Sequence, residues 1–458
     1  MTVTQKIQKK LSDSATARWT AMLVVSFTMM CGYFITDVMA PLEAILTKTV
    51  AEGGLGWSSD EYGFFSGAYG YINVFLLMLF FGGIILDKFG IRFTGIMSCS
   101  LMLAGTLIKW YAVNNNFGDA QLIGYSMQVV IAALGFSIFG VGAEIAGITV
   151  TKVIAKWFAG HELALAMGLQ VAMARIGTAA ALACSLPLAN MLGNPASPIL
   201  LGAALLCIGL IAYIVYCVMD RKLDASVAAT TTEPEPGFSF NDLKFIFTNR
   251  GFWLIAILCV LFYSGVFPFL KFATKLMIFK YGVAEELAGL IPAMLPFGTI
   301  LLTPLFGAIY DKIGKGATLM IIGSAMLTLV HVLFALPILN EGWFAIIIMI
   351  MLGIAFSLVP SAMWPSVPKI IPMNQLGSAY AIIFYIQNIG LSMVPMLIGK
   401  VIQNYSTITA PDGTITGYDY TIPMSIFAIF GLVAIIVAML LKKADASFNY
   451  GLEKKNVK

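Results

Sequence analysis

Charge is scarce in this chain of 458 residues: Asp, Glu, Lys and Arg make up 11% of it, whereas hydrophobic residues make up 59%. A soluble domain carries about 25% charged residues, so this composition excludes an ordinary water-facing surface and indicates a surface that faces lipid. The net charge of +4 gives no indication of a nucleic-acid partner. We therefore expect the lipid bilayer itself to be the main partner of the chain.

Side chains for metal or covalent chemistry are also few. The two histidines, His161 and His331, lie in separate halves, and the six cysteines form no CxxC pair. The chain has no HExxH, no GxSxG and no Walker A loop, which counts against a membrane enzyme and against an ATP-driven pump. We expect no enzyme, no cofactor and no metal, and we interpret His331 as a packing residue.

Long apolar runs are abundant. A helix needs about 20 apolar residues to cross roughly 30 Å of hydrocarbon, and these runs lack the period-two alternation of barrel strands. Twelve runs qualify: 18–46, 61–86, 93–112, 121–150, 162–191, 198–218, 252–278, 285–310, 317–339, 343–364, 376–401 and 422–441. The sequence therefore predicts an all-α membrane protein of twelve transmembrane helices.

The longest polar stretch divides these runs into six and six. We expect an N-terminal six-helix bundle over 1–219, a cytoplasmic linker over 220–250 and a C-terminal six-helix bundle over 251–458. The linker contains a flexible part, 225–237, and an amphipathic segment, 238–247, that should lie on the membrane surface. If the N-terminus is inside, the inner loops collect most of the 27 basic residues, so both termini should be cytoplasmic.

One loop pattern occurs twice, after the second span of each half. It reads G-x3-D-x2-G-x-R over 83–92 and G-x3-D-x2-G over 307–314. In the first copy the Asp87 carboxylate can pair with Arg92 or accept hydrogen bonds from a helix N-terminus, which would stabilise one conformation. The alternative is a plain topology signal. Duplication favours gating in a two-bundle secondary transporter, through Gly83, Asp87, Gly90, Arg92, Asp311 and Gly314.

Two opposite charges fall at similar depth inside the membrane. Glu144 lies 12 residues before Lys156 and Arg175 lies 14 residues after His161, so both sit roughly 18–21 Å from the turn between their spans at 1.5 Å per residue. Ionisable groups at this depth are functional candidates. An acid and a base there suit a small zwitterion, whose ammonium and carboxylate they would bind. The alternative is a structural ion pair.

Other polar residues in the spans are candidates for the same site. Asp37 is either a cavity carboxylate or a cap near the outer water. Lys271 and Lys275 should extend to the interface rather than bind ligand. The remaining candidates could equally form interhelical hydrogen bonds: Tyr69, Asn73, Tyr263, Gln387 and Asn388.

Several segments resemble one branch of the major facilitator superfamily, the lysosomal dipeptide transporter family called domain-containing protein 1. The matching segments are Gly32–Asp37, Phe81–Arg92, Gly140–Glu144, Trp157–Leu163, Met173–Gly177, Val266–Phe269, Trp364-Pro365, Leu376–Tyr380 and Ile386–Gly390. The resemblance implies facilitated diffusion of dipeptides, with Glu144 and Arg175 at the two termini of the substrate.

The chain departs from that family at a few positions. Phe136 stands where the fourth span of the family usually has arginine, and Tyr71-Ile72 replaces Trp-Pro. The N-terminus has no acidic dileucine signal, so we expect a bacterial inner-membrane homologue, or a lysosomal membrane protein if the source is eukaryotic. We expect a monomer and leave an accessory subunit open.

The main alternative function is proton-coupled symport of an organic anion such as a sugar acid. A polytopic membrane enzyme is the remote alternative.

Overall fold

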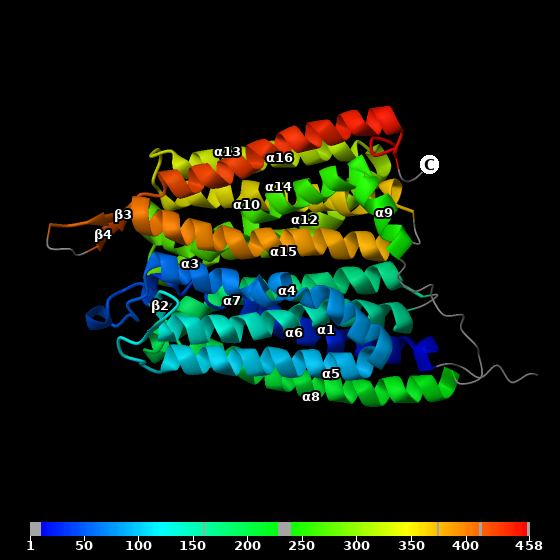
Figure 1. Cartoon of the computed structure of the whole chain (residues 1–458), viewed down its shortest axis with the longest axis horizontal. Helices are drawn as coiled ribbons and strands as arrows, with labels where there is room; N and C mark the ends of the chain where they lie inside the picture. The colour runs from blue at the N-terminus through cyan, green and yellow to red at the C-terminus, as the bar shows by residue number, and fades with distance from the viewer. Residues whose placement is uncertain (1–10, 159–160, 228–239, 373–374, 412–414, 456–458) are drawn as a thin grey trace, which may run out of the picture.

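The computed structural model describes residues 11–158, 161–227, 240–372, 375–411 and 415–455, and its helices run side by side in two halves (Figure 1). The N-terminal half contains α1 (Ala15–Asp37), α2 (Glu43–Leu46), α3 (Ser59–Gly67), the 3-10 turn η3 (Ala68–Gly70), α4 (Tyr71–Phe75), α5 (Met78–Asn114), α6 (Met127–Trp157), α7 (Leu163–Leu192) and α8 (Ser197–Val227). The C-terminal half contains α9 (Phe240–Thr248), α10 (Arg250–Tyr281), α11 (Glu285–Ala288), α12 (Leu290–Ile313), α13 (Gly316–Ala335), α14 (Gly342–Ile370), α15 (Leu376–Val401) and α16 (Thr421–Phe448).

Eleven described helices are long and apolar enough to cross a membrane. One of them, α5, contains the end of the second predicted span and all of the third, because the chain turns inside it at Gly90 (φ 75°). Positive φ is a conformation that glycine adopts without strain. Together with the shorter helices of 59–75, these eleven helices account for the twelve predicted crossings.

The first, second and fourth predicted spans differ in their course from the prediction. The first span was expected to reach residue 46, but α1 ends at Asp37 and a turn leads into the short helix α2. The second span is not one helix: η3 interrupts it, and it breaks again at Leu77, which has a φ of 53°. Residues 121–126 form a two-stranded hairpin instead of helix. Apolarity predicts a crossing but does not mark where the helix hydrogen bonds stop.

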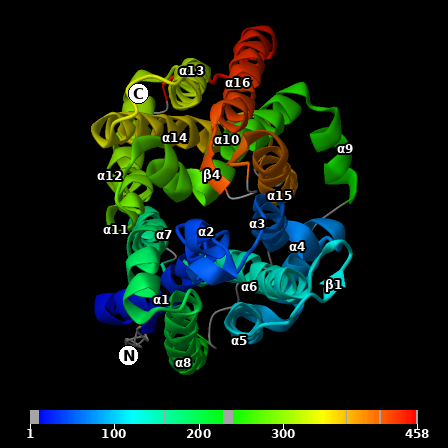
Figure 2. The same cartoon turned by 90° about the vertical axis from the view of Figure 1, so that its left-hand side faces the viewer.

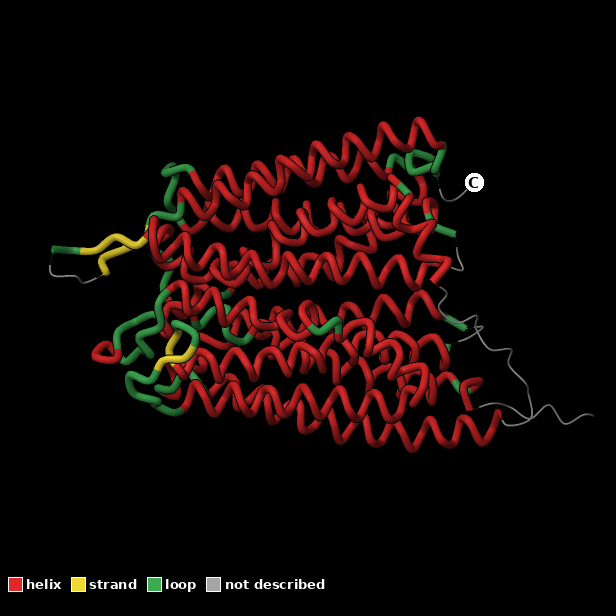
Figure 3. Tube along the Cα trace, viewed as in Figure 1, coloured by secondary structure: helices red, strands yellow, loops and turns green. Residues whose placement is uncertain are grey.

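The bundle has two distinct ends. One carries both hairpins, β1 (Gln121–Leu122) with β2 (Tyr125–Ser126) and β3 (Thr407–Thr409) with β4 (Ile415–Tyr418) (Figures 1 and 3). We call it the hairpin end, and it faces the viewer in Figure 2. The opposite end, here the terminal end, carries the first and last described segments. Both copies of the duplicated loop lie at the terminal end.

The predicted linker lies partly beyond what the structure describes. Residues 228–239 are outside the described residues, and α8 extends to Val227 before them. The amphipathic segment corresponds to α9, in which Phe245 and Phe247 are exposed and Ile246 is buried. Two aromatic side chains of this short helix are therefore exposed.

Three ion pairs between described residues join the two halves, and each lies at the hairpin end. Asp37 of α1 accepts from Lys271 of α10 at 2.7 Å, and Lys48 pairs with Glu285 at 2.7 Å. Glu43 and Lys275 pair at 3.4 Å, and both of their side chains are 0% exposed. These contacts close the hairpin end by electrostatic attraction across the boundary between the halves.

The sequence predicted that the two lysines of α10 extend to the membrane–water interface, and this prediction is wrong. Lys271 donates to the Asp37 carboxylate and to the Thr36 carbonyl, and Lys275 lies over the Tyr418 ring at 3.9 Å from its centroid. Both ammonium groups point toward the protein interior because their acidic partners, Asp37 and Glu43, lie on the other half. A lysine near a span end extends to water only when no such partner is within reach.

The first copy of the duplicated loop is held by carboxylates of α8. Arg92 pairs with Asp220 at 3.2 Å and with Asp224 at 2.7 Å, and Lys156 of α6 pairs with the same two residues. Asp87 pairs with Lys152 at 2.6 Å. The predicted Asp87–Arg92 pair is therefore wrong for this conformation, because α8 supplies two acids to Arg92 and α6 supplies a lysine to Asp87.

The second copy is held by the C-terminal tail. Gly314 has a φ of 74°, as Gly90 does, and the following Lys315 and Gly316 donate backbone hydrogen bonds to the carbonyls of Glu453 and Leu452. The Glu453 carboxylate accepts from the Thr318 amide at 2.9 Å, at the N-terminus of α13. A carboxylate at this position compensates the helix dipole. The two copies share a sequence pattern but not a partner.

Breaking the fully buried ion pair should shift the protein toward conformations that open at the hairpin end. Lys275→Met leaves the Glu43 carboxylate buried without a cation, which costs roughly 3–5 kcal/mol in the closed arrangement. Spin labels at Glu52 and Glu286, which are exposed on opposite halves, should then report a new, longer distance by pulsed electron paramagnetic resonance.

The matched control is Lys48→Met. The Lys48 and Glu285 side chains are 36% and 31% exposed, so water already solvates this pair, which contributes about 0–1 kcal/mol. The control should leave the distance distribution almost unchanged. Equal shifts in both variants would refute the importance of burial.

The α8 network yields a stability prediction. Asp220 is 0% exposed and also lies within hydrogen-bonding distance of Trp157 and Tyr216, at 3.3 and 3.2 Å. Asp220→Ala should lower the free energy of unfolding by roughly 1–3 kcal/mol, because buried donors lose their acceptor. Asp224→Ala, with a 44% exposed side chain, should cost less than about 1 kcal/mol. Denaturation of detergent-purified protein measures both, and a larger loss for Asp224→Ala would contradict the network.

Candidate substrate site between the two halves

The Glu144 carboxylate is held at the boundary between the halves. It belongs to α6 and accepts a hydrogen bond from the Tyr69 hydroxyl at 2.9 Å. Tyr69 is placed by η3, whose Ala68 carbonyl accepts from Ser137 of α6 at 2.6 Å. The Asn388 side chain of α15, in the other half, is within hydrogen-bonding reach of the same carboxylate. The Tyr69 hydroxyl therefore orients Glu144, and Asn388 brings the C-terminal half close to it.

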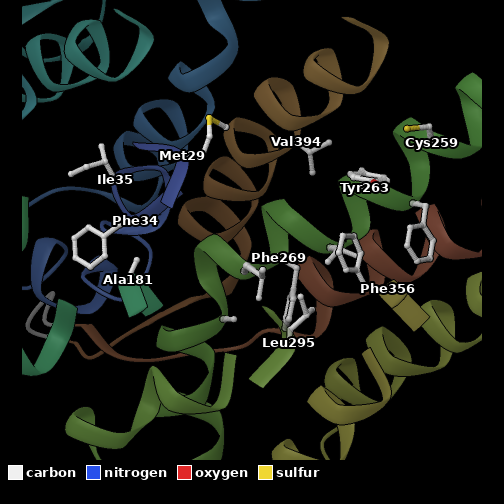
Figure 4. Packing of buried hydrophobic residues seen from close by; sticks show 14 of the residues in the cluster. Met29, Phe34, Ile35, Ala181, Cys259, Tyr263, Phe269, Leu295, Phe356 and Val394 are labelled. Carbon is white, nitrogen blue, oxygen red and sulfur yellow. The ribbon is translucent and has the colours of Figure 1, made fainter. Parts of the chain in front are cut away.

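Arg175 of α7 also reaches across the boundary. Its guanidinium lies 5.6 Å from the ring centroid of Phe267 in α10 and 5.4 Å from that of Phe356 in α14. Cation–π contacts of this kind attract a guanidinium but leave its donors available. Figure 4 shows Phe356 beside Tyr263 on the C-terminal half. Arg175 is partly exposed.

Glu144 and Arg175 form no ion pair with each other among the residues that the structure describes. The structural ion pair considered from the sequence is thus absent from this conformation. The acid already has neutral hydrogen-bonding partners, whereas the guanidinium has only aromatic faces in the described part of the chain. An anionic group would form charge-assisted hydrogen bonds with the Arg175 guanidinium.

A cavity of about 70 Å³ adjoins Glu144 on the N-terminal half. Residues of α1, η3, α5 and α6 line it, including Met29, Tyr33, Tyr69, Met102 and Glu144. Tyr33 lies within electrostatic range of Arg175 as well as of Glu144. Tyr33, which lines the cavity, is therefore near both of the opposite charges.

The C-terminal half supplies most of the remaining predicted candidates. Tyr263 of α10 packs on Phe267 and Phe356 and accepts a hydrogen bond from the Trp364 indole at 3.0 Å. Gln387 and Asn388 are buried on α15, where Gln387 accepts from the Cys259 thiol at 3.6 Å. Asn388 thus approaches Glu144, while Tyr263 is joined to the rings beside Arg175.

Two predicted residues lie elsewhere than in an open site. Asp37 is 5% exposed and paired with Lys271, so it is neither a cap near the outer water nor a free carboxylate. Asn73 is 0% exposed, and its side-chain amide has no hydrogen-bonding partner in the described residues. His331 is the packing residue that was expected, buried against Phe269 with Nε2 at 2.7 Å from the Gly265 carbonyl.

Sequence reasoning missed several residues near the site. Tyr33 and Phe267 lie in segments that carry the family resemblance, but neither was singled out there, and Phe356 lies outside those segments; aromatic residues are common in apolar spans. Lys109 did give a signal in the sequence, since it is a charge inside a predicted span. It is 0% exposed and donates to the Ile35 carbonyl at 3.1 Å, with Phe136 4.5 Å away. The unusual phenylalanine of the fourth span therefore faces a buried cation.

The predicted gating residues form a separate group at the terminal end. They lie in the loop networks described above, in α5 and around the end of α12. The predicted set is thus two clusters, one around the opposite charges between the halves and one in the loops: Gly83, Asp87, Gly90, Arg92, Asp311 and Gly314.

Comparison with known proteins identifies relatives over most of the chain. The lysosomal dipeptide transporter MFSD1 of Homo sapiens is 27% identical over 405 residues, 84% of this chain and 80% of that protein. MFSD1 of Danio rerio is 29% identical over 353 residues, 73% of this chain and 71% of that protein. Among solved structures, an inward-facing bacterial homolog to the human lysosomal transporter Spinster superposes with a TM-score of 0.70 at 14% identity, covering 94% and 98% of the two chains.

These proteins are transporters, which agrees with the prediction that the chain is not an enzyme. The resemblance found in the segments from Gly32 to Gly390 is confirmed by the relatives. Residues 15–395 match the family model described as Major Facilitator Superfamily. The helical architecture and this match lead to one conclusion: the chain is a multi-pass membrane protein that belongs to the major facilitator superfamily.

Proposed function

We propose that this chain is a secondary transporter that moves dipeptides by alternating access. In this proposal Glu144 binds the ammonium group of the substrate and Arg175 binds its carboxylate. The observation that carries it is the state of Arg175, a guanidinium set between two phenyl rings with no carboxylate partner in the described residues. A guanidinium in these surroundings would be stabilised most by a ligand that carries an anionic group.

The positions of the two charges also support a coupling between binding and the contact between the halves. Glu144 comes from the N-terminal half and is reached by Asn388 from the C-terminal half. Arg175 comes from the N-terminal half and faces rings of the C-terminal half. A substrate that engages both charges would therefore touch both halves, which is the requirement for a ligand that favours their rocking around it.

The relatives support the substrate class. The MFSD1 proteins of several vertebrates are named lysosomal dipeptide transporters, and they align with most of this chain. A dipeptide carries the two opposite charges that the site would bind. Facilitated diffusion is the mode that this resemblance favours; proton-coupled symport of an organic anion is the alternative to be tested.

We further propose that both termini are cytoplasmic. Basic residues gather at the terminal end, among them Arg18, Arg92, Lys152 and Lys156, as expected for the inner side of a membrane protein. The hairpin end would then face outward, and the described conformation would be closed to the outside. A bacterial plasma membrane and a monomeric protein complete this proposal.

Blocking the amino or the carboxyl terminus of a dipeptide tests directly which terminus Glu144 and Arg175 each bind. Loss of one charge-assisted hydrogen bond costs roughly 1.5–3 kcal/mol, or about 10–100-fold in Kd. Wild-type protein should bind alanyl-alanine more tightly than its N-acetyl or its C-terminal amide form by such factors, measured by thermal stabilisation of purified protein. Glu144→Gln should remove the discrimination against the N-acetyl form alone, and Arg175→Ala that against the amide alone.

Arg175→Lys is the matched variant, since it keeps the charge but loses the planar fork, and it should retain part of the discrimination. If the assignments were exchanged between the two variants, the orientation of the substrate would be reversed. Binding of single carboxylates that survives Glu144→Gln, with no binding of dipeptides, would replace the proposal by the organic-anion alternative.

Facilitated diffusion predicts uptake that follows the dipeptide gradient alone. In proteoliposomes loaded with buffer, initial uptake of labelled alanyl-alanine should be the same with and without an imposed pH gradient. A protonophore should not reduce accumulation. Uptake above the external concentration that collapses with the protonophore would show proton coupling instead.

A further inference from the structure

Apolar residues and glycines make up part of the lining of the cavity beside Glu144, here called its floor: Met29 and Gly32 of α1, Met102 of α5 and Gly147 of α6. The rest of the lining includes Tyr33, Thr36, Tyr69 and Glu144. Met29 and Met102 are buried, with 6% and 1% of their surface exposed, so both side chains are packed parts of this wall. Figure 4 shows Met29 on the N-terminal half.

Two glycines keep the cavity open. A Cβ atom at Gly147 would lie 3.9 Å from Met29 Cε, an ordinary contact distance, so a methyl group fits there and a longer side chain would extend into the space. A Cβ atom at Gly32 would lie 3.2 Å from Met102 Sδ, which is already tight. Gly147 is therefore the position at which the volume of the cavity can be changed with least disturbance of the helices.

The cavity lies where the first side chain of a bound dipeptide must go. In an α-amino acid the ammonium group and the side chain leave the same carbon atom. An ammonium group bound to Glu144 therefore places the first side chain next to this carboxylate, whose other neighbour is the cavity. The second side chain leaves the substrate nearer to the carboxylate that Arg175 would hold.

We infer that this cavity is the subsite for the first side chain of the substrate, and that Gly147 sets which side chains it admits. The inference rests on the proposed function. A cavity of roughly 150 Å³ holds benzene, so one of about 70 Å³ suits small aliphatic side chains. The floor offers no counter-charge to a charged side chain. The protein thus selects dipeptides that begin with alanine or valine over those that begin with phenylalanine.

The test compares two series of dipeptides, X-Ala and Ala-X, in which X is Gly, Ala, Val, Leu or Phe. Thermal stabilisation and proteoliposome uptake are measured for wild type and for Gly147→Leu. The substitution should weaken Val-Ala relative to Gly-Ala by roughly tenfold or more, the scale on which a hydrophobic pocket discriminates a few carbon atoms. It should leave the ranking within the Ala-X series unchanged.

The control is Gly168→Leu in α7, where a Cβ atom would have no neighbour within 4 Å and which does not line the cavity. It adds the same side chain to a helix and should change neither series. Met29→Ala supplies the opposite effect: it removes part of the wall and should admit Phe-Ala. Gly147→Ala and Met29→Ala also preserve the test if Gly147→Leu does not fold, because both disturb packing less.

The outcomes separate the two proposals. If wild-type protein binds no dipeptide of either series, the proposed function fails. If it binds dipeptides but Gly147→Leu and Met29→Ala leave the X-Ala ranking as in wild type, or change the Ala-X ranking instead, the proposed function stands and the subsite inference is overturned.

Discussion

The buried ion pairs at the hairpin end are the constraint on which the rest of the structure depends. Removing one partner of a buried ion pair leaves an uncompensated buried charge, which is strongly destabilising, and here the two partners of each pair lie on different halves. Asp37 binds Lys271, and Glu43 binds Lys275. These contacts fix the end of α1 against α10, which sets the separation of the residues that face each other deeper in the bundle. Opening this end must therefore expose or re-pair these charges.

The candidate site also holds charged groups at the boundary between the halves, but there Arg175 has no anionic partner in the described part of the chain. Glu144 is satisfied by the Tyr69 hydroxyl, and Asn388 is within its reach from the other half. Arg175 rests on phenyl rings that attract its charge without accepting its hydrogen bonds. A site of this kind is oriented before the substrate arrives, and it keeps its strongest donor for the substrate. The cavity next to Glu144 would add selection by the size of a substrate side chain to selection by the charges of the substrate.

The two copies of the loop pattern show how one local sequence can be stabilised in different ways. In the N-terminal half, Arg92 binds two acids of α8, and a separate lysine binds Asp87. In the C-terminal half, the backbone after Gly314 binds the tail, and Glu453 caps α13. The second glycine of each copy has a positive φ, but the partners come from segments that the pattern does not include. The pattern alone therefore located the two loops, but it named the wrong partner for Arg92 in this conformation.

The sequence by itself determined the membrane-spanning helices and the depth of the charges within them. This follows because a backbone in lipid must satisfy its hydrogen bonds within its own helix, so an apolar run of sufficient length has one solution. Glu144 and Arg175 could be found in the same way, as charges that apolar surroundings make conspicuous. Only the tertiary structure decided which charge meets which, as with Lys271 and Asp37, where the second span breaks, and where a cavity remains. Those outcomes depend on contacts between helices far apart in the chain, and hydrophobic periodicity carries no information about such contacts.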